Sequence, residues 1–97
     1  MKEYYVYILT NSAKTVLYIG VTNDLSKRQR QHFDAHGSID SFTGKYRAYY
    51  LIYYETYTDI REAITREKQL KGWKRSKKID LITKQNPQWQ FLSKDNA

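Results

Sequence analysis

Two patterns of apolar positions divide the chain into strand-like and helix-like segments. Residues 4–10, 16–22 and 46–56 are dense in Tyr, Ile, Val, Leu and Thr. Such β-branched and aromatic runs predict three strands. Only the polar residues 11–15 separate the first two runs, so we expect these two strands to form an antiparallel hairpin.

Three other segments favour helices. The cap-type residues 22–24 precede a helical stretch that reaches about Phe33. Thr58 and Asp59 precede a second helix from Ile60 to about Lys71, and Gly72 is placed to end it. A third, short helix follows the basic stretch 71–78 and stops before the proline at position 87.

The remaining segments set the organisation of the chain. Residues 34–45 are small and polar and predict a long surface loop, and residues 93–97 are expected to fray. The order strand, strand, helix, strand, helix, helix predicts an α+β fold around a small, mainly antiparallel sheet. A chain of 97 residues has room for one core, so we expect a single domain over residues 1–92.

The two carboxylates of the second predicted helix lie on different faces of it. With 100° per residue, Ala63, Ile64 and Leu70 fall on the face of Ile60, and Glu67 lies at about −20° within that apolar stripe. Glu62 lies on the polar side, where it can pair with Arg66 four residues on. A carboxylate that faces the core must be paired, hydrogen-bonded or bound to metal. For Glu67, an internal ion pair and a functional site are equally compatible with the pattern.

The first helix carries the same anomaly with the opposite charge. Measured from Leu25, Arg28 lies at about −60° and His32 at about −20°, so both lean inward on one face. Together with Glu67 they form either a structural network or half of a phosphate site. In a phosphate site a guanidinium grips the phosphate and an acid holds Mg²⁺. By itself, His32 is more typical of a satisfied core residue.

Composition narrows the partners. The chain has 17 Lys and Arg against 10 Asp and Glu, a net charge of +7, which favours nucleic acid or an anionic membrane. No cysteine is present and there are only two histidines, which excludes disulfides and thiolate chemistry and disfavours zinc. No signal-like or membrane-spanning run occurs, so the default expectation is a cytoplasmic protein.

Several of these residues resemble the motifs of one family. Residues 5–7 (Tyr-Val-Tyr) in the first strand, residues 18–20 (Tyr-Ile-Gly) in the second, Arg28 and Glu67 resemble the GIY-YIG nuclease superfamily. The likeness spans nearly the whole chain, and residues 24–28, 66–71 and 86–89 resemble its small, stand-alone bacterial members. The second triplet is intact, whereas the first has Tyr and Val where Gly and Ile would stand.

The resemblance implies a three-stranded antiparallel sheet flanked by helices and hydrolysis of phosphodiester bonds in nucleic acid, usually DNA. It implies one divalent ion, Mg²⁺ or Mn²⁺, with Glu67 as its ligand and Arg28 as the clamp on the scissile phosphate. Tyr7 and Tyr18 would be the hydroxyls near the reacting oxygen. His32 matches a histidine that some members place nearby. Gly20 completes the second triplet, and Asn86 is loosely similar to a late asparagine of some members.

On this resemblance, Tyr7 orients and deprotonates the attacking water. Because a free tyrosine has a pKa near 10, we expect neighbouring cations, His32 and Arg28, to lower the pKa of Tyr7.

Basic side chains just after the second helix, together with one lysine before the third strand, predict a nucleic-acid-binding surface. Residues 71–78 interleave base and aromatic, a composition that suits phosphate contact with stacking. Equally, Trp73 could pack into the core while the lysines solvate a turn. The candidate nucleic-acid contacts are Lys45, Lys71, Lys74, Arg75, Lys77 and Lys78.

Two rival functions remain at this point. A non-catalytic nucleic-acid-binding module on the same fold has the same charge and the same tyrosines, although it has little need of Glu67, Arg28 and Tyr7. A membrane-surface protein is disfavoured because no predicted helix combines a large apolar face with a basic one. So small a domain is expected to select nucleic-acid structure over sequence, or to rely on a protein partner. Its oligomeric state stays open.

Overall fold

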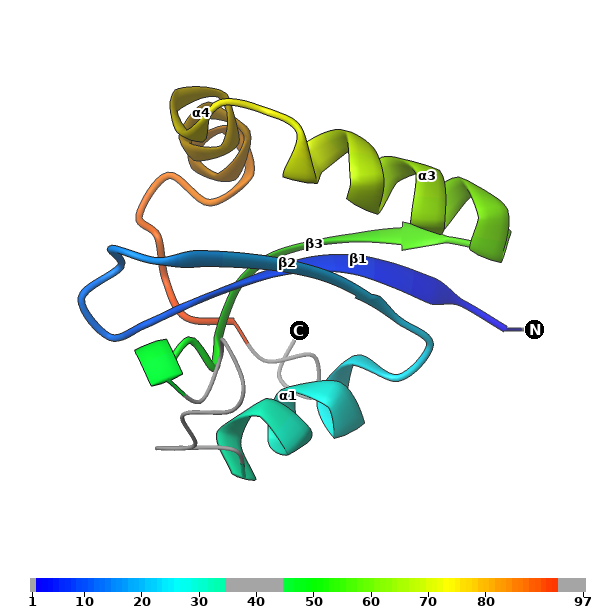
Figure 1. Cartoon of the computed structure of the whole chain (residues 1–97), viewed down its shortest axis with the longest axis horizontal. Helices are drawn as coiled ribbons and strands as arrows, with labels where there is room; N and C mark the ends of the chain where they lie inside the picture. The colour runs from blue at the N-terminus through cyan, green and yellow to red at the C-terminus, as the bar shows by residue number, and fades with distance from the viewer. Residues whose placement is uncertain (1, 35–44, 93–97) are drawn as a thin grey trace.

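The computed structural model describes residues 2–34 and 45–92, with side chains described outside residues 32–34. Its elements follow the predicted order (Figure 1). They are β1 (Tyr4–Thr10), β2 (Leu17–Thr22), α1 (Leu25–Asp34), β3 (Tyr50–Tyr57), α3 (Ile60–Lys71) and α4 (Arg75–Gln85). The predicted loop at 34–45 and tail at 93–97 fall mostly outside the described residues. Within the described residues no helix is long and apolar enough to cross a lipid bilayer.

The sheet has the order β2-β1-β3, and both neighbouring pairs are antiparallel. The predicted α+β class with an antiparallel sheet is therefore confirmed. The third strand begins at Tyr50, however, and not at residue 46. Residues 45–46 are helical and Arg47 has φ 56°, a left-handed backbone that a regular strand cannot contain.

The central strand β1 is buried on both faces. Val6 and Ile8 belong to a cluster with residues of α3 and α4, whereas Tyr5, Tyr7 and Leu9 belong to a second cluster. That second cluster includes a residue of α1. Figure 1 shows the same division, with α3 and α4 on one side of the sheet and α1 on the other. The sheet is therefore the middle layer of three.

The segment that follows α4 provides a hydrogen-bond partner for a bulge in β3. The β1–β3 register shifts between Ile8 and Leu9, which leaves Ile52 as the extra residue. The Nδ2 group of Asn86 donates to the carbonyl oxygens of Ile52, at 3.0 Å, and Gln90, at 2.9 Å, and its Oδ1 accepts from the Gln90 N–H. Asn86 thus satisfies the backbone of the bulge and fixes the chain after α4.

Helix α3 confirms its predicted ends and only part of its predicted face. Asp59 caps it, with its Oδ1 accepting from the Arg61 N–H at 2.8 Å, and Gly72 follows its last residue. Ala63 and Leu70 are fully buried, but Ile60 is 42% exposed and Ile64 38% exposed. The prediction that both isoleucines face the core was wrong, because the sheet covers a narrower stripe of the helix than the apolar pattern spans.

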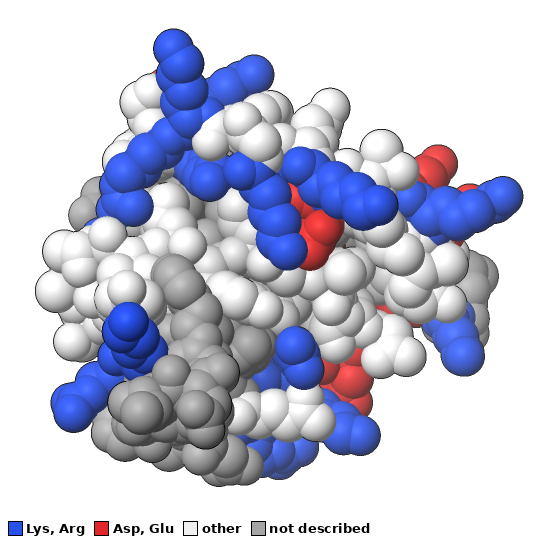
Figure 2. Space-filling model, viewed as in Figure 1, with Lys and Arg blue, Asp and Glu red and all other residues white. Residues whose placement is uncertain are grey.

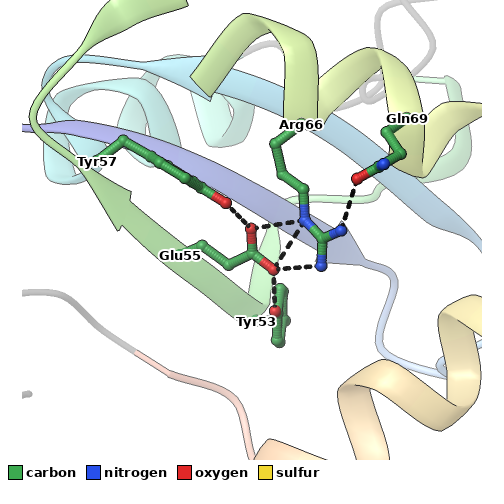
Figure 3. Close-up of polar contacts among 5 residues, drawn as sticks. All are labelled: Tyr53, Glu55, Tyr57, Arg66 and Gln69. Atoms are coloured by element: carbon green, nitrogen blue, oxygen red, sulfur yellow. Dashed lines mark hydrogen bonds and ion pairs between the residues drawn. The ribbon is translucent and has the colours of Figure 1, made fainter. Parts of the chain in front are cut away.

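A partly buried ion pair holds α3 on β3, and the sequence pattern missed it. The guanidinium of Arg66 donates from Nε to Glu55 at 3.0 Å and from a terminal nitrogen to Gln69 at 2.7 Å (Figure 3). Tyr53 and Tyr57 on the same face of β3 donate their hydroxyls to the same carboxylate. The i,i+4 spacing had indicated that Arg66 pairs with Glu62. In the structure Arg66 pairs instead with Glu55 on β3.

The Glu55 carboxylate stays ionised at this site. Burial by itself raises its pKa, but hydrogen bonds from Arg66, Tyr53 and Tyr57 outweigh that effect, so the pKa of Glu55 lies below its ordinary value. The two tyrosines respond in the opposite sense. Burial and the adjacent carboxylate raise the pKa of Tyr57 to about 12, and the same two causes raise the pKa of Tyr53.

We expect Glu55→Gln to lower the free energy of unfolding by about 1–3 kcal/mol near neutral pH, because it removes a charged acceptor from buried donors. A folded-state pKa below the unfolded one stabilises the fold at pH above about 4.3 and loses that contribution as pH falls through the folded value. Urea unfolding at several pH values measures both effects. The exposed Glu62→Gln is the matched control, and a Glu55→Gln deficit that stays constant down to about pH 2 would contradict this assignment.

Candidate active site

Tyr7 and Arg28 meet between β1 and α1. The Nε of Arg28 donates a hydrogen bond to the hydroxyl oxygen of Tyr7 at 3.2 Å. Tyr7 is 1% exposed, whereas Arg28 is only partly buried and can still present its guanidinium to a ligand. The inward lean predicted for Arg28 is therefore present, and it is set by the start of α1. There Asp24 Oδ1 accepts from the Lys27 N–H at 3.0 Å.

Gly20 makes room for the Tyr7 ring. The two residues are register partners on β2 and β1, so their side-chain positions share one face of the sheet. A Cβ at position 20 would overlap the hydroxyl end of the ring. The ring thus lies across β2, and its hydroxyl extends toward the free edge of the sheet. The glycine of the second triplet is required by this close approach.

Tyr18 joins the same group from β2. Its ring centroid lies 6.4 Å from that of Tyr7 with a tilt of 39°. The hydrogen bond from Arg28 to Tyr7 is the largest cause that raises the pKa of Arg28, and Tyr18 adds to it. The guanidinium is therefore held between two phenols and keeps its full positive charge.

The electrostatic state of Tyr7 differs from the one the sequence led us to expect. Burial raises the pKa of Tyr7, and the hydrogen bond from Arg28 offsets this only in part. The charge of Glu67 raises it further, which places that carboxylate within electrostatic range of the phenol. The expected lowering of the Tyr7 pKa was wrong for the metal-free protein, so Tyr7 carries its proton there.

Glu67 lies on α3, in the opposite layer of the fold from α1, and its charge acts on Tyr7. Its side chain is 14% exposed, as its position in the apolar stripe predicted, and it forms an ion pair with Lys71 Nζ at 2.7 Å. Arg66 and Glu67 are neighbours on α3, and Arg66 turns to β3. The sequence pattern did not pick out the Lys71 pair, although its i,i+4 spacing was visible.

The donor set limits which metal the site could hold. Among the described residues no group of three or more His, Cys, Asp and Glu side chains is placed to hold an ion. Mg²⁺ and Mn²⁺ nevertheless fit, because Mg²⁺ is usually bound through one or two carboxylates while water and substrate oxygens complete its shell. Glu67 is the carboxylate that could fill this part.

An open groove adjoins Arg28. It has a volume of about 460 Å³ and is lined by residues 21–24 together with Lys27, Arg28 and Gln31. The Oε1 of Gln31 accepts from an Arg28 terminal nitrogen at 3.3 Å. Helix phase predicts that Lys27 and Gln31 face away from the side of Arg28, and neither was among the predicted site residues, yet both line this groove with Arg28.

The predicted basic surface is present, but many of its cations already have protein contacts. Lys77 Nζ lies 4.1 Å from the centroid of the Trp73 ring, and the Arg66 guanidinium also lies over this ring, at 5.1 Å. Trp73 packs against the core, as one of the two alternatives held. Arg75 donates to the Thr15 carbonyl oxygen at 2.8 Å. Figure 2 shows Lys and Arg side chains gathered along the side of the molecule formed by α3 and α4.

The remaining predicted residues lie apart from this group or outside the description. The amide of Asn86 is engaged with backbone at the β3 bulge, away from the β2 edge, and lies outside the group. The side chain of His32 lies outside the described residues. Lys45 is exposed, with its Nζ 5.3 Å from the Tyr46 ring centroid. Lys74 is exposed at the start of α4, and Lys78 in its first turn is partly buried.

Comparison with known families identifies the class of protein to which this fold and this group of side chains belong. The model of the GIY-YIG catalytic domain matches residues 3–80. The chain therefore belongs to the GIY-YIG family, part of a nuclease superfamily.

Individual relatives are small proteins of similar length. A UPF0213 protein of Syntrophus aciditrophicus is 37% identical over 89 residues, which is 91% of this chain and 98% of the relative. A UPF0213 protein of Bacillus pumilus is 39% identical over 76 residues, 78% of this chain and 74% of the relative. The solution NMR structure of a UPF0213 protein from Bacillus halodurans is similar with a TM-score of 0.55 and 26% identity, covering 90% of this chain and 89% of that one.

Two glycines test the role of the close approach. We expect Gly20→Ala to destabilise the fold by about 1–3 kcal/mol, because the new methyl group displaces a buried ring. Gly72 has φ −82° and only ordinary contacts around an added Cβ, so Gly72→Ala should be neutral or stabilise by less than about 1 kcal/mol. Thermal unfolding followed by circular dichroism compares the two, and equal stability of both variants would contradict the packing argument.

Proposed function

We propose that this protein is a divalent-metal-dependent endonuclease that hydrolyses phosphodiester bonds in nucleic acid, with DNA as the principal substrate. The observation that carries the proposal is the hydrogen bond between Arg28 and Tyr7. Tyr18 lies beside it, and the Glu67 charge acts on it. Membership of the GIY-YIG family supports the same reaction class.

Each side chain has a separate part in the proposed reaction. Arg28, which keeps its positive charge, binds the non-bridging oxygens of the scissile phosphate and balances the charge that develops there. Tyr7, which holds its proton in the metal-free protein, orients the attacking water through its hydroxyl. Tyr18 keeps the guanidinium in place. Glu67 would hold the metal, which supplies Lewis-acid polarisation of the phosphate and stabilises the leaving oxygen.

The protonation state of Tyr7 decides its part in the proposed reaction. Burial and the Glu67 charge both favour the neutral phenol. The Arg28 guanidinium is the group that favours the phenolate, and burial outweighs it, so the pKa of Tyr7 stays raised. Tyr7 therefore acts through its neutral hydroxyl, which orients the attacking water.

The substrate surface supports structure selectivity over sequence selectivity. The groove beside Arg28 is open and polar, and the basic side chains of α3 and α4 suit contact with a phosphate backbone. Phosphate contacts position a nucleic acid without reading its sequence. A non-catalytic binding module would share this surface, but it has no need of a largely buried carboxylate whose charge acts on Tyr7.

Cleavage assays test the proposal directly. Linear, nicked, flap and junction DNAs and an RNA are incubated with Mg²⁺ or Mn²⁺. We expect Glu67→Gln to reduce cleavage to background and Tyr7→Phe to reduce the rate by about 10²–10⁴ while nucleic-acid affinity is kept.

Glu62→Gln and Tyr46→Phe are the matched controls, because both residues are exposed on the same small domain. Full activity of Glu67→Gln would rule out the metal assignment. If the protein binds nucleic acid in EDTA and yields no cleavage product from any substrate with either metal, the non-catalytic binding module is favoured instead.

A further inference from the structure

Lys71 lies against the carboxylate that the proposed mechanism assigns to the metal. Its Nζ is 2.7 Å from Glu67 Oε2, one helical turn along α3. The two side chains differ in exposure: Glu67 is 14% exposed and Lys71 54% exposed. The ammonium therefore approaches a largely buried carboxylate from the solvent side, the side from which a metal or a phosphate would also arrive.

This ion pair differs from an ordinary pair on the helix surface. In the pair between Arg61 and Asp59 the side chains are 88% and 37% exposed, so water can solvate both charges. Water solvates the Glu67 carboxylate much less, and a poorly solvated charge needs a counter-ion. Lys71 supplies that counter-ion in the metal-free protein.

A metal bound through Oε2 of Glu67 would compete with Lys71 for that oxygen. Among the described residues no cluster of carboxylates and imidazoles offers the metal another place. Ligation through Oε2 therefore requires the ammonium to withdraw, and the exposed, flexible lysine stem allows this. Once withdrawn, the ammonium is a free cation at the edge of a site that binds phosphate.

We propose that Lys71 is an exchangeable counter-ion: it neutralises Glu67 in the metal-free protein, yields the carboxylate to the metal, and then contacts a phosphate of the substrate. The proposal rests on the assignment of Glu67 as the metal ligand. It predicts that metal and nucleic acid reinforce each other's binding, because the exchange turns an internal ion pair into two cations that face the substrate.

The first test needs no metal. Binding of a fluorescein-labelled DNA hairpin in EDTA is measured by anisotropy at several salt concentrations. The measured quantity is the slope of log affinity against log salt concentration, called the salt slope. In the wild-type background Lys71→Met should leave the salt slope unchanged, because Glu67 already neutralises Lys71. In the Glu67→Gln background the lysine is released, and Lys71→Met should lower the slope by about one unit. Lys74→Met removes an exposed lysine of the same segment, and it should change the salt slope by the same amount in both backgrounds.

The second test measures metal affinity without turnover. Titration calorimetry with Mn²⁺ on the full chain should show tighter binding to Lys71→Met by up to about fivefold, the ratio that the loss of a competing, partly exposed ion pair allows. Lys71→Arg keeps the pair and should stay close to wild type. Lys74→Met gives the effect of losing one nearby positive charge.

The outcomes separate this proposal from the proposed function. If Lys71→Met lowers the salt slope equally in both backgrounds, or binds Mn²⁺ no more tightly than Lys74→Met, the counter-ion role of Lys71 is wrong. If Glu67→Gln retains wild-type affinity for Mn²⁺, the metal assignment fails, and the experiment in EDTA still decides whether Lys71 and Glu67 are paired. Circular dichroism of each variant confirms that the comparison is made between folded proteins.

Discussion

Burial of the central strand on both faces is the constraint on which the rest of the structure depends. Every residue from Tyr5 to Thr10 is at most 8% exposed, and the side chains of residues 5–9 each belong to one of two separate clusters. Strand alternation then directs Val6 and Ile8 to α3 and α4, and Tyr7 to the layer of α1. A shift of one residue in the register would exchange the two sets and bury the wrong groups against each helix. The position of the Tyr7 hydroxyl is therefore fixed by core packing, before any ligand is present.

From this constraint follows the location of the site at an edge of the sheet. The Tyr7 ring extends over Gly20 toward the free edge of β2, where helices from both layers can approach it. Arg28 comes from one layer and Glu67 from the other. The ion pair between Arg66 and Glu55 anchors α3 to β3 at the residue before Glu67, and so fixes the direction in which Glu67 points. Two adjacent residues of α3 thus have different partners: Arg66 pairs with Glu55 on β3, and Glu67 pairs with Lys71 on the helix itself.

The sequence predicted most of the helices and strands and the inward positions of Arg28 and Glu67, because both follow from local geometry. Helix phase depends only on local geometry, so it showed that Arg28 and Glu67 lean inward. It could not show the partner of Arg66, because the Glu55 carboxylate is brought near by tertiary packing of β3 under α3. The same limit explains why Ile60 and Ile64 are exposed, and why the positive φ of Arg47 interrupts a tyrosine-rich run that looked like strand. The protonated state of Tyr7 likewise depends on burial, which no residue pattern measures.

The net charge of +7 overstates the charge that a nucleic acid would meet. Arg66 is bound to Glu55, Lys71 to Glu67, and Lys77 lies on the Trp73 ring. These cations differ in how they could be released. Arg66 holds a partly buried carboxylate with three hydrogen bonds, so freeing it would break all three and leave that charge uncompensated. Lys71 holds its partner through one exposed ammonium, and a divalent ion can replace it. The basic surface therefore has a fixed part that builds the fold and an exchangeable part at the site, and only the second can couple metal binding to substrate binding.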